Sequence, residues 1–505
     1  MASHVPVPHQ QRRDTMAVLG MVLISPAFLA SYVACAVYLF TLAPTVFTLD
    51  SAELTLAAYT LGLAHSPGYP TYLLSLHMFQ QLPIGDVGYR SNLFSALANS
   101  FSVGALTFIC QQLCSRWEPA VIAALCFAFS VSVWSVSVDA EVYTFQGAIL
   151  AAVLLLLERW RRLGQPVAFI GAVGVFCLGV ANSSATMLLA PGVAWIALIT
   201  PQRHVLRRRH VLALVGVSIL ALSPILYLPI RSLSHPEFVS VGFYDAQAIF
   251  HPLDLASFAS LRDYMSGRQF EGLFFANLTS EPGLHVLTFL SNLTIAFFGI
   301  GLPLGVWGFW SLWRRDRILT VGLALTAIPH AIFFITYGAF DTSLMFLPVY
   351  LVWTVFLGMG IFMLFREFSV TSARLIALLP LMMLFVNAPI ASLRTVTDPA
   401  DLARQRLREA APYALYLATW GDADIMRYYQ IVDGMRVDVQ VVNRFFVPED
   451  QLVPLVVTAI QRKRPVYVTS QELVLPDGYR AVSTGNGYRI MPQVGNKELG
   501  RRIPE

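Results

Sequence analysis

The sequence predicts a bundle of transmembrane helices followed by a small α/β domain at the C-terminus. Of the 505 residues, 56% are hydrophobic and only 13% are charged, and the mean hydropathy is +0.62. Soluble domains average about 25% charged residues, so a chain this apolar needs lipid around it. Near residue 393 charges become dense and helix and strand patterns begin to alternate. We therefore divide the chain into residues 1–395 and 396–505.

Eleven apolar segments are candidate spanning helices, each approaching the about 20 apolar residues that a span requires. They are 16–42, 91–113, 119–137, 141–158, 166–181, 183–200, 210–231, 285–312, 318–338, 343–365 and 373–393. The first run is longer than the apolar core of about 7–15 residues in a signal peptide. We therefore interpret it as a retained helix.

The charges in the connecting loops predict the orientation of these helices. With the N-terminus in the cytoplasm, the basic clusters all fall inside, at 12–13, 159–162, 203–210, 314–317 and 366–374. The segments that fall outside are the long loops 43–90 and 232–284, the acidic turns 139–141 and 340–342, and the C-terminal region. This predicts a multi-pass protein of the plasma (inner) membrane with an extracytoplasmic C-terminal domain.

Residues 396–505 predict a small α/β domain because helical and strand patterns alternate. The expected helices are 399–410, 424–431 and 451–462, and the expected strands are 414–419, 437–442 and 465–469. Two further helices, at 51–63 and 71–82, are expected to lie along the membrane interface within the first outer loop. Serines at 130–135 interrupt the third predicted span.

The composition argues against several classes of protein. The formal net charge of +4 is small, and no compact basic patch with interleaved aromatic residues is present, so we expect no nucleic-acid partner. The five cysteines lie in or beside apolar runs, and none forms a Cys-x-x-Cys pair. Neither a disulfide framework nor a zinc site is therefore supported. The expected partners are membrane lipids.

The first candidate site is the pair Asp50 and Glu53, just past the outer end of the first predicted span. Asp-x-x-Glu before an apolar helical run is typical of a capping box, in which each side chain covers a free backbone amide. Alternatively, one carboxylate acts as a general base, because an attacking hydroxyl group must lose its proton. The two interpretations are compatible, since a capping carboxylate is also held rigidly.

A second group of candidates is suited to anions. Two prolines flank a glycine at 65–70, which predicts a fixed turn. Within it, His65 could donate to a phosphate and Tyr69 could stack on a ring. Arg231 ends the seventh span on the outer side, where its guanidinium could pair with phosphate or anchor the helix at the interface. Arg90 is a weaker candidate of the same kind.

Acidic residues also begin the fourth span. Asp139 and Glu141 could cap the helix and interact with its dipole. They could instead bind the acceptor or a divalent cation such as Mg²⁺ or Mn²⁺, and the sequence leaves open whether a cation is required.

In the C-terminal region, Trp-Gly-Asp-Ala-Asp at 420–424 follows a predicted strand. Ligands often bind at such ends, but a turn with a helix cap is the favoured interpretation of this motif.

Together these motifs resemble the bacterial protein O-mannosyltransferase-like family of C-type glycosyltransferases. The resemblance rests on Asp-x-x-Glu at 50–53, His-x-Pro-Gly-Tyr-Pro at 65–70 and Tyr-Arg-x-Asn-Leu at 89–93. Weaker matches lie at 140–143, 227–231, 346–348, 420–422 and 437–443. The chain departs from the family at 179–184, where relatives often have a histidine and this sequence has none.

The resemblance implies inverting transfer of a sugar, with mannose as a candidate, from a polyprenyl-phosphate carrier to an acceptor hydroxyl on the outer face of the membrane. It implies that Asp50 is the base and that Glu53 supports it. It implies that His65 and Arg231 lie near the donor phosphate. With Tyr69 and Arg90, which are chosen for their chemistry, they are the candidate donor-binding residues. The acceptor is a protein, a glycan or a lipid.

Two other functions are compatible with the sequence. A non-catalytic scaffold or assembly subunit could retain the same fold. A transporter of lipid-linked sugar is the second alternative, but transporters usually place charges midway through their helices. Here the acidic groups cluster at the predicted outer ends, which favours the enzyme.

Overall fold

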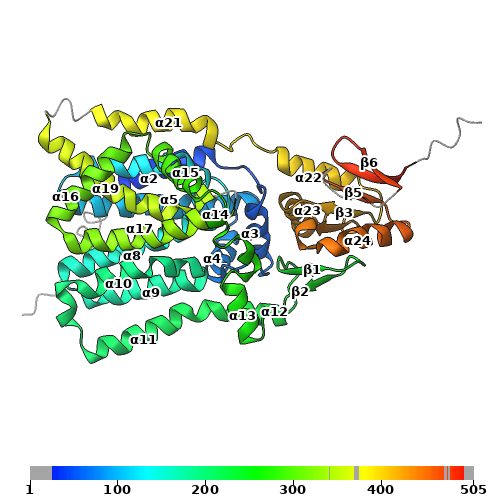
Figure 1. The fold of residues 1–505 in the computed structure, drawn as a ribbon, viewed down its shortest axis with the longest axis horizontal. Helices are drawn as coiled ribbons and strands as arrows, with labels where there is room; N and C mark the ends of the chain where they lie inside the picture. The colour runs from blue at the N-terminus through cyan, green and yellow to red at the C-terminus, as the bar shows by residue number, and fades with distance from the viewer. Residues whose placement is uncertain (1–24, 340–341, 369–374, 471–474, 476–477, 494–505) are drawn as a thin grey trace, which may run out of the picture.

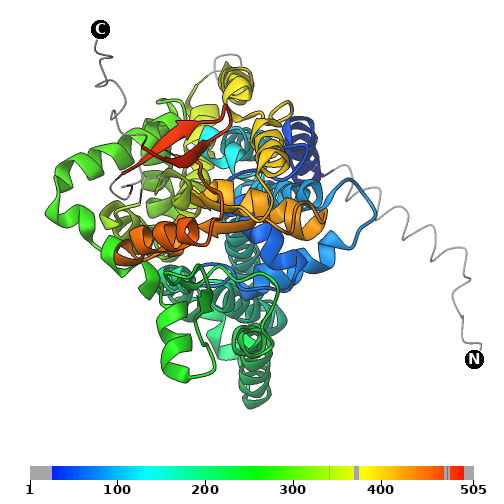
Figure 2. The same ribbon diagram turned by 90° about the vertical axis from the view of Figure 1, so that its right-hand side faces the viewer.

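The computed structural model describes residues 25–339, 342–368, 375–470, 475 and 478–493. Its helices form an elongated bundle, and an α/β unit at the C-terminus covers one end of that bundle (Figures 1 and 2). The predicted fold class is therefore confirmed. The basic pair at 12–13, the start of the first span and parts of the segments 340–342 and 366–374 lie outside the described residues.

The bundle consists of helices that coincide with the predicted spans. They are α2 (Pro26–Thr41), α5 (Val87–Cys114), α6 (Trp117–Ala128), α7 (Val131–Ser135), α8 (Val142–Leu163), α9 (Pro166–Asn182), α10 (Ala190–Ile199), α11 (Arg208–Leu222), α12 (Tyr227–Leu233), α15 (Pro282–Ala296), α16 (Gly301–Arg315), α17 (Arg317–Thr336), α19 (Leu347–Glu367) and α21 (Leu378–Ala391). Five described helices are long and apolar enough to cross a membrane, or six if a bent pair counts as one. Five further apolar helices are shorter, so the total of eleven spans stays a prediction.

The predicted span 285–312 is wrong as one continuous helix. Helices α15 and α16 meet at an angle of 94°. The chain breaks at Phe298 and Gly299, whose φ angles of +54° and +70° lie outside the right-handed helical region. Hydropathy does not reveal this bend, because the segments on both sides of it are apolar.

The first long loop forms two short helices, as predicted. Helix α3 (Asp50–Tyr59) and helix α4 (Pro70–Gln80) lie across the end of the bundle, between it and the C-terminal unit (Figure 1). The second long loop contributes a hairpin of β1 (Gly242–Tyr244) and β2 (Phe250–Pro252). It also contains α13 (Phe258–Met265) and α14 (Ala276–Thr279). Both loops therefore lie at the same end of the molecule.

The C-terminal unit has all six predicted elements. These are α22 (Asp398–Glu409), β3 (Leu415–Ala418), α23 (Trp420–Val432), β4 (Gln440–Asn443), α24 (Glu449–Gln461) and β5 (Val466–Val468). A hairpin of β6 (Tyr479–Ser483) and β7 (Tyr488–Pro492), which was not predicted, completes a five-stranded sheet in the order β4-β3-β5-β7-β6. Strand β3 runs parallel to β4 and β5, whereas β7 runs antiparallel to β5 and β6.

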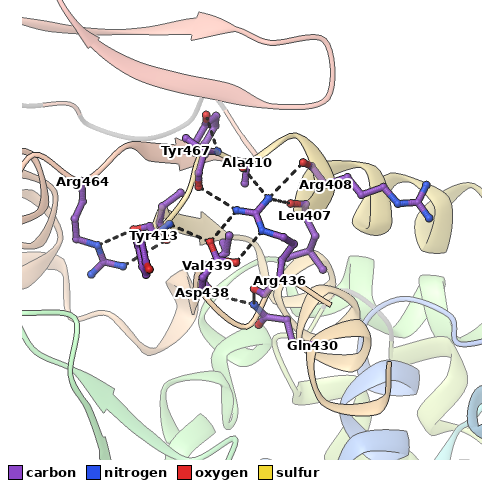
Figure 3. Close-up of polar contacts among 12 residues, drawn as sticks. Leu407, Arg408, Ala410, Tyr413, Gln430, Arg436, Asp438, Val439, Arg464 and Tyr467 are labelled. Atoms are coloured by element: carbon purple, nitrogen blue, oxygen red, sulfur yellow. Dashed lines mark hydrogen bonds and ion pairs between the residues drawn. The ribbon is translucent and has the colours of Figure 1, made fainter. Parts of the chain in front are cut away.

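Arg436 fixes the corner between α22 and the sheet (Figure 3). Its guanidinium donates to the backbone carbonyls of Leu407 and Ala410 at 2.9 Å and 2.8 Å. Carbonyls at the C-terminal end of a helix have no partner within the helix, so these hydrogen bonds satisfy them. The same guanidinium pairs with Asp438. Hydrogen bonds from Arg436 are the main reason that the pKa of Asp438 lies well below its usual value. We interpret this network as structural.

Three hydrophobic cores hold these parts together. The largest lies inside the helical bundle and includes Trp134, Trp160 and Tyr350. A second core joins side chains of α3 and α4 to side chains of α22 and α23, among them Leu56 and Met426. The third lies against the sheet of the C-terminal unit. Because the second core is shared, the C-terminal unit is packed onto the first loop.

Candidate active site

Glu53 and His65 form a buried pair at the end of the bundle. Glu53 is fully buried, and one of its carboxylate oxygens lies 2.9 Å from Nδ1 of His65. The other accepts a hydrogen bond of 2.5 Å from the backbone N–H of His65. Both oxygens are therefore used to orient one histidine. Burial by itself would lower the pKa of His65, but the charges of Glu53 and then Asp50 outweigh it and raise the pKa to about 9.

Asp50 lies beside this pair but is more open. Its carboxylate is 3.9 Å from Nε2 of His65, and 30% of its side chain is exposed. The same ring nitrogen lies 3.2 Å from the hydroxyl of Tyr69. The first loop thus brings together four of the predicted residues: Asp50, Glu53, His65 and Tyr69.

The capping-box interpretation of Asp50 and Glu53 is wrong. Helix α3 begins at Asp50 itself, its N-cap residue is Leu49, and no side chain makes a capping hydrogen bond there. The acidic side chains interact with His65 instead. Sequence spacing cannot distinguish the two arrangements, because the partner of Glu53 is twelve residues away.

The turn at 65–70 is held from the second long loop. The backbone N–H of Ser66 donates to Gln269 at 3.1 Å, and its hydroxyl donates to the backbone carbonyl of Tyr264. Gly68 has a φ of +89°, and a Cβ atom there would lie 2.6 Å from the ring of Tyr264. Only glycine therefore fits without strain. The turn is fixed, as predicted, and this fixes His65.

A cavity of about 870 Å³ opens beside this cluster. Its polar lining includes Asp50, His65, Tyr69, Glu141, Gln146, Asn182, Ser183 and Ser184. Its apolar lining is rich in aromatic rings, among them Phe270, Phe274, Phe333, Phe334 and Tyr337. None of the described residues that line it is lysine or arginine. The polar lining therefore comes from the first loop, the start of α8 and residues 182–184, and the aromatic lining comes from the second long loop and the C-terminal end of α17.

The second acidic pair lies near the first. Asp139 and Glu141 are each only 9% exposed, and Glu141 lines the cavity. Glu141 is the N-cap residue of α8 by position but makes no capping hydrogen bond through its side chain. Burial, and secondarily Asp50, raises the pKa of Asp139 to about 7. The predicted cap is therefore not formed, and these groups lie at the site.

The two predicted arginines lie outside the cavity lining. Arg90 donates to the backbone carbonyl of Leu82 at 2.6 Å. Arg231 donates to the backbone carbonyls of Leu61 and Thr60. Both guanidinium groups thus support the first loop and its flanks. Their role in phosphate binding stays a prediction, which the geometry does not favour.

The C-terminal unit reaches the same site through α23. Trp420 lines the cavity, and its ring lies 5.5 Å from that of His65 in an edge-to-face arrangement. Asp424, one turn further along the helix, is 1% exposed. Asp422 instead pairs with Arg406 inside the C-terminal unit. The motif at 420–424 therefore provides both a wall of the cavity and a structural ion pair.

The cluster also has the composition of a cation site. Ligand atoms of Asp50, Glu53 and His65 all lie within 4.8 Å of one another. A metal-bound histidine usually pairs its other ring nitrogen with a carboxylate, so the residues fit a cation on Asp50 and Nε2 of neutral His65, oriented by Glu53. Mixed carboxylate and imidazole ligands suit Mn²⁺ or Zn²⁺ better than Mg²⁺. A bound cation would supply positive charge where His65 otherwise carries a proton.

Several lining residues were not predicted. Gln146, on α8, and His330, on α17, are polar side chains within apolar spans, which is a signal that sequence analysis can use. Asn182 lies in the segment 179–184, where the sequence departs from the family pattern. The aromatic wall could not be found this way, because phenylalanine is common throughout apolar helices.

The architecture is similar to that of the solved structures of ArnT. ArnT from Cupriavidus metallidurans bound to undecaprenyl phosphate superposes with a TM-score of 0.60 at 12% identity, covering 93% of this chain and 98% of that one. The same protein in the apo state gives 0.57 at 13% identity, covering 95% and 98%. At these identities the likeness establishes the fold alone.

Sequence comparisons find relatives for the first part of the chain. Residues 50–206 match the model of the "Protein O-mannosyl-transferase TMEM260 N-terminal domain". Protein O-mannosyl-transferase TMEM260 from Mus musculus is 29% identical over 203 residues, which is 39% of this chain and 29% of the mouse protein. The Dictyostelium discoideum protein of the same name is 22% identical over 217 residues, 39% of this chain and 26% of its own length. These matches support the resemblance to O-mannosyltransferase-like glycosyltransferases. The chain matches less than a third of the length of either relative.

Proposed function

We propose that the protein is an inverting glycosyltransferase that moves mannose from a polyprenyl-phosphate carrier to a hydroxyl group of an acceptor protein. The observation that carries the proposal is the buried Glu53–His65 pair beside the more open Asp50, which lines a cavity. The relatives' names support mannose and a protein acceptor. The ArnT structure with undecaprenyl phosphate supports a lipid-linked donor.

In this mechanism Asp50 is the general base. The acceptor hydroxyl transfers its proton to Asp50 as its oxygen forms a bond to the anomeric carbon of the sugar. The bond from that carbon to the phosphate oxygen breaks at the same time, so the configuration inverts and polyprenyl phosphate leaves. Asp50 suits this role because its side chain is 30% exposed, whereas both oxygens of Glu53 already bind His65.

His65 provides the positive charge that the departing phosphate needs. Glu53 and Asp50 hold its proton, with a pKa of about 9. No lysine or arginine is present among the described lining residues, so the imidazolium ring is the best placed cation. A divalent ion at the same cluster would take over this charge.

The two walls of the cavity match the two parts of the donor. Gln146, Asn182, Ser183 and Ser184 offer neutral donors and acceptors to sugar hydroxyls. The aromatic lining from the second long loop and α17 offers an apolar surface for the start of the lipid tail. A tail that stays in lipid while the sugar stays in water places the site at the membrane surface. We propose that this surface is the outer face of the plasma membrane, with the C-terminal domain outside and the N-terminus in the cytoplasm.

Reconstitution in proteoliposomes with a labelled polyprenyl-phospho-mannose and an acceptor peptide rich in serine and threonine tests this function. Wild type should transfer label, and Asp50→Asn should reduce kcat by about 10²–10⁴-fold. Transfer that is unchanged in Asp50→Asn would reject the catalytic assignment. A wild-type protein that transfers no sugar from any donor would favour the scaffold.

A further inference from the structure

The C-terminal unit approaches the first loop more closely than ordinary packing allows. Gly421, in the first turn of α23, lies against Thr48 and Leu49. A Cβ atom at position 421 would be 2.3 Å from Oγ1 of Thr48 and 3.0 Å from the backbone N of Leu49. Such contacts are well inside van der Waals distance, so only glycine permits this approach.

The contact falls on the corner from which the proposed base projects. Leu49 has a φ of +57°, a conformation that is uncommon for a residue other than glycine. Asp50 follows directly as the first residue of α3. A strained corner persists only where its surroundings hold it. Here the surrounding element is the first turn of α23.

A second feature of α23 points to the same cluster. Asp424 is 1% exposed, and neither carboxylate oxygen has a hydrogen-bond partner in the described structure. Burial, and secondarily the charge of Glu53, raises the pKa of Asp424 well above its usual value, and Arg427, Asp50 and His65 also act on it. A buried carboxyl group without hydrogen bonds destabilises a fold. Such a group needs a functional explanation, because an apolar side chain would serve packing better.

We propose that helix α23 is the positioning element of the active site. In this proposal Gly421 holds the Thr48–Leu49 corner, and the buried carboxyl group of Asp424, one turn further along, supports the Glu53–His65 pair. The inference rests on the proposed function but adds to it, because the C-terminal unit becomes a part of the catalytic apparatus. The shared hydrophobic core of α3 and α23 gives this helix the rigidity that the role requires. Gly421 and Asp424 need not touch the substrate.

The first test is the variant Gly421→Ala in the full-length protein, assayed for sugar transfer in proteoliposomes. A displaced Asp50 should lower kcat by about 10- to 100-fold, while KM for the lipid donor changes by less than about 3-fold, since the cavity walls on α8 and α17 are untouched. The double variant Gly421→Ala/Thr48→Ala removes the closest clashing atom and should recover much of kcat. Gly216→Ala is the matched control, because no atom lies within 4 Å of a Cβ there.

The second test separates positioning from simple packing. Asp424→Ala should lower kcat by about 10-fold while leaving the melting temperature unchanged or raised, because it removes an unpaired buried carboxyl group. A merely structural residue would instead lower the melting temperature and leave kcat unchanged.

The proposal is overturned if kcat of Asp424→Ala equals that of wild type, or if Gly421→Ala folds and transfers normally. If Gly421→Ala does not fold, Asp424→Ala decides alone. Absence of transfer by wild type would instead count against the proposed function.

Discussion

Two acidic loops at the same end of the bundle look alike in the sequence but differ in their surroundings. In the first, Glu53 is buried against His65 and Asp50 stays open to the cavity. In the second, Asp139 and Glu141 are both nearly buried, and burial is the main reason that the pKa of Asp139 is raised. The difference indicates that the surroundings of the carboxylates, a histidine in the first loop and burial in the second, set the two pairs apart.

The protonation states follow from this difference. Glu53 and Asp50 stabilise the charged form of His65, so the first loop carries both signs of charge. Burial raises the pKa of Asp139 and so favours its neutral form. We therefore expect the first loop to carry the chemistry and the second to shape the cavity.

The largest difference is expected between Glu53→Gln and Glu141→Gln. Glutamine keeps the shape of glutamate but loses the charge that holds the proton on His65, so Glu53→Gln should lower kcat by about 100-fold, at the low end for loss of acid–base function. Glu141→Gln alters only the cavity wall and should cost less than about 10-fold. Initial rates at saturating donor measure both effects.

Thermal unfolding of the same two variants provides the control. Breaking a buried ion pair costs about 3–5 kcal/mol, so Glu53→Gln should also melt earlier. Equal losses of kcat in the two variants would remove the distinction between the loops. Assays must therefore be run well below the melting temperature of the less stable variant.

The second expected effect is on the pH dependence of transfer. The pKa of His65 is raised from 6.5 to about 9 in the folded protein. The stabilising contribution of this charge is therefore complete below about pH 6.5 and is lost as the pH rises through about 9. The catalytic contribution is lost only near pH 9, where His65 of the folded protein loses its proton. Transfer should fall about 10-fold per pH unit on that alkaline limb. A His65→Gln variant should be slow and lack the limb.

A bound cation would change this outcome in a recognisable way. If Asp50 and His65 hold a metal, the imidazole is neutral and the alkaline limb is absent in wild type as well. Chelation should then abolish transfer, and Mn²⁺ should restore it. Transfer that survives chelation and still falls through pH 9 would favour the imidazolium.

Much of the fold could be predicted from the sequence because hydropathy and strand–helix alternation report directly on lipid and core contacts. The six elements of the C-terminal region and the two helices of the first loop follow from such local patterns. The bend between α15 and α16 depends instead on local backbone angles at Phe298 and Gly299. The hairpin of β6 and β7 was missed because its strands are only partly buried, which weakens the alternation signal.

The site was predictable where its residues are close in the chain. Asp50, Glu53, His65 and Tyr69 belong to one loop, and a motif can contain them all. Arg231 was chosen for its chemistry, but its hydrogen bonds to the backbone of the first loop depend on tertiary packing. Asp424 is hundreds of residues from Glu53, so only the folded chain brings the two helices together.

The smallest expected effect concerns Asp139→Asn and tests the second loop alone. Because its pKa is about 7 instead of 3.8, the folded protein binds the proton more tightly, and stability falls as the pH rises from about 4 to 7. Asparagine should remove this fall and stabilise the protein at pH 8 by at most about 4 kcal/mol. Transfer should change by less than about 3-fold, since a neutral group replaces a group that is largely neutral below pH 7. Melting curves between pH 4 and 8 measure the expected change in stability. A loss of transfer comparable to that of Glu53→Gln would show instead that the two acidic loops act as one catalytic unit.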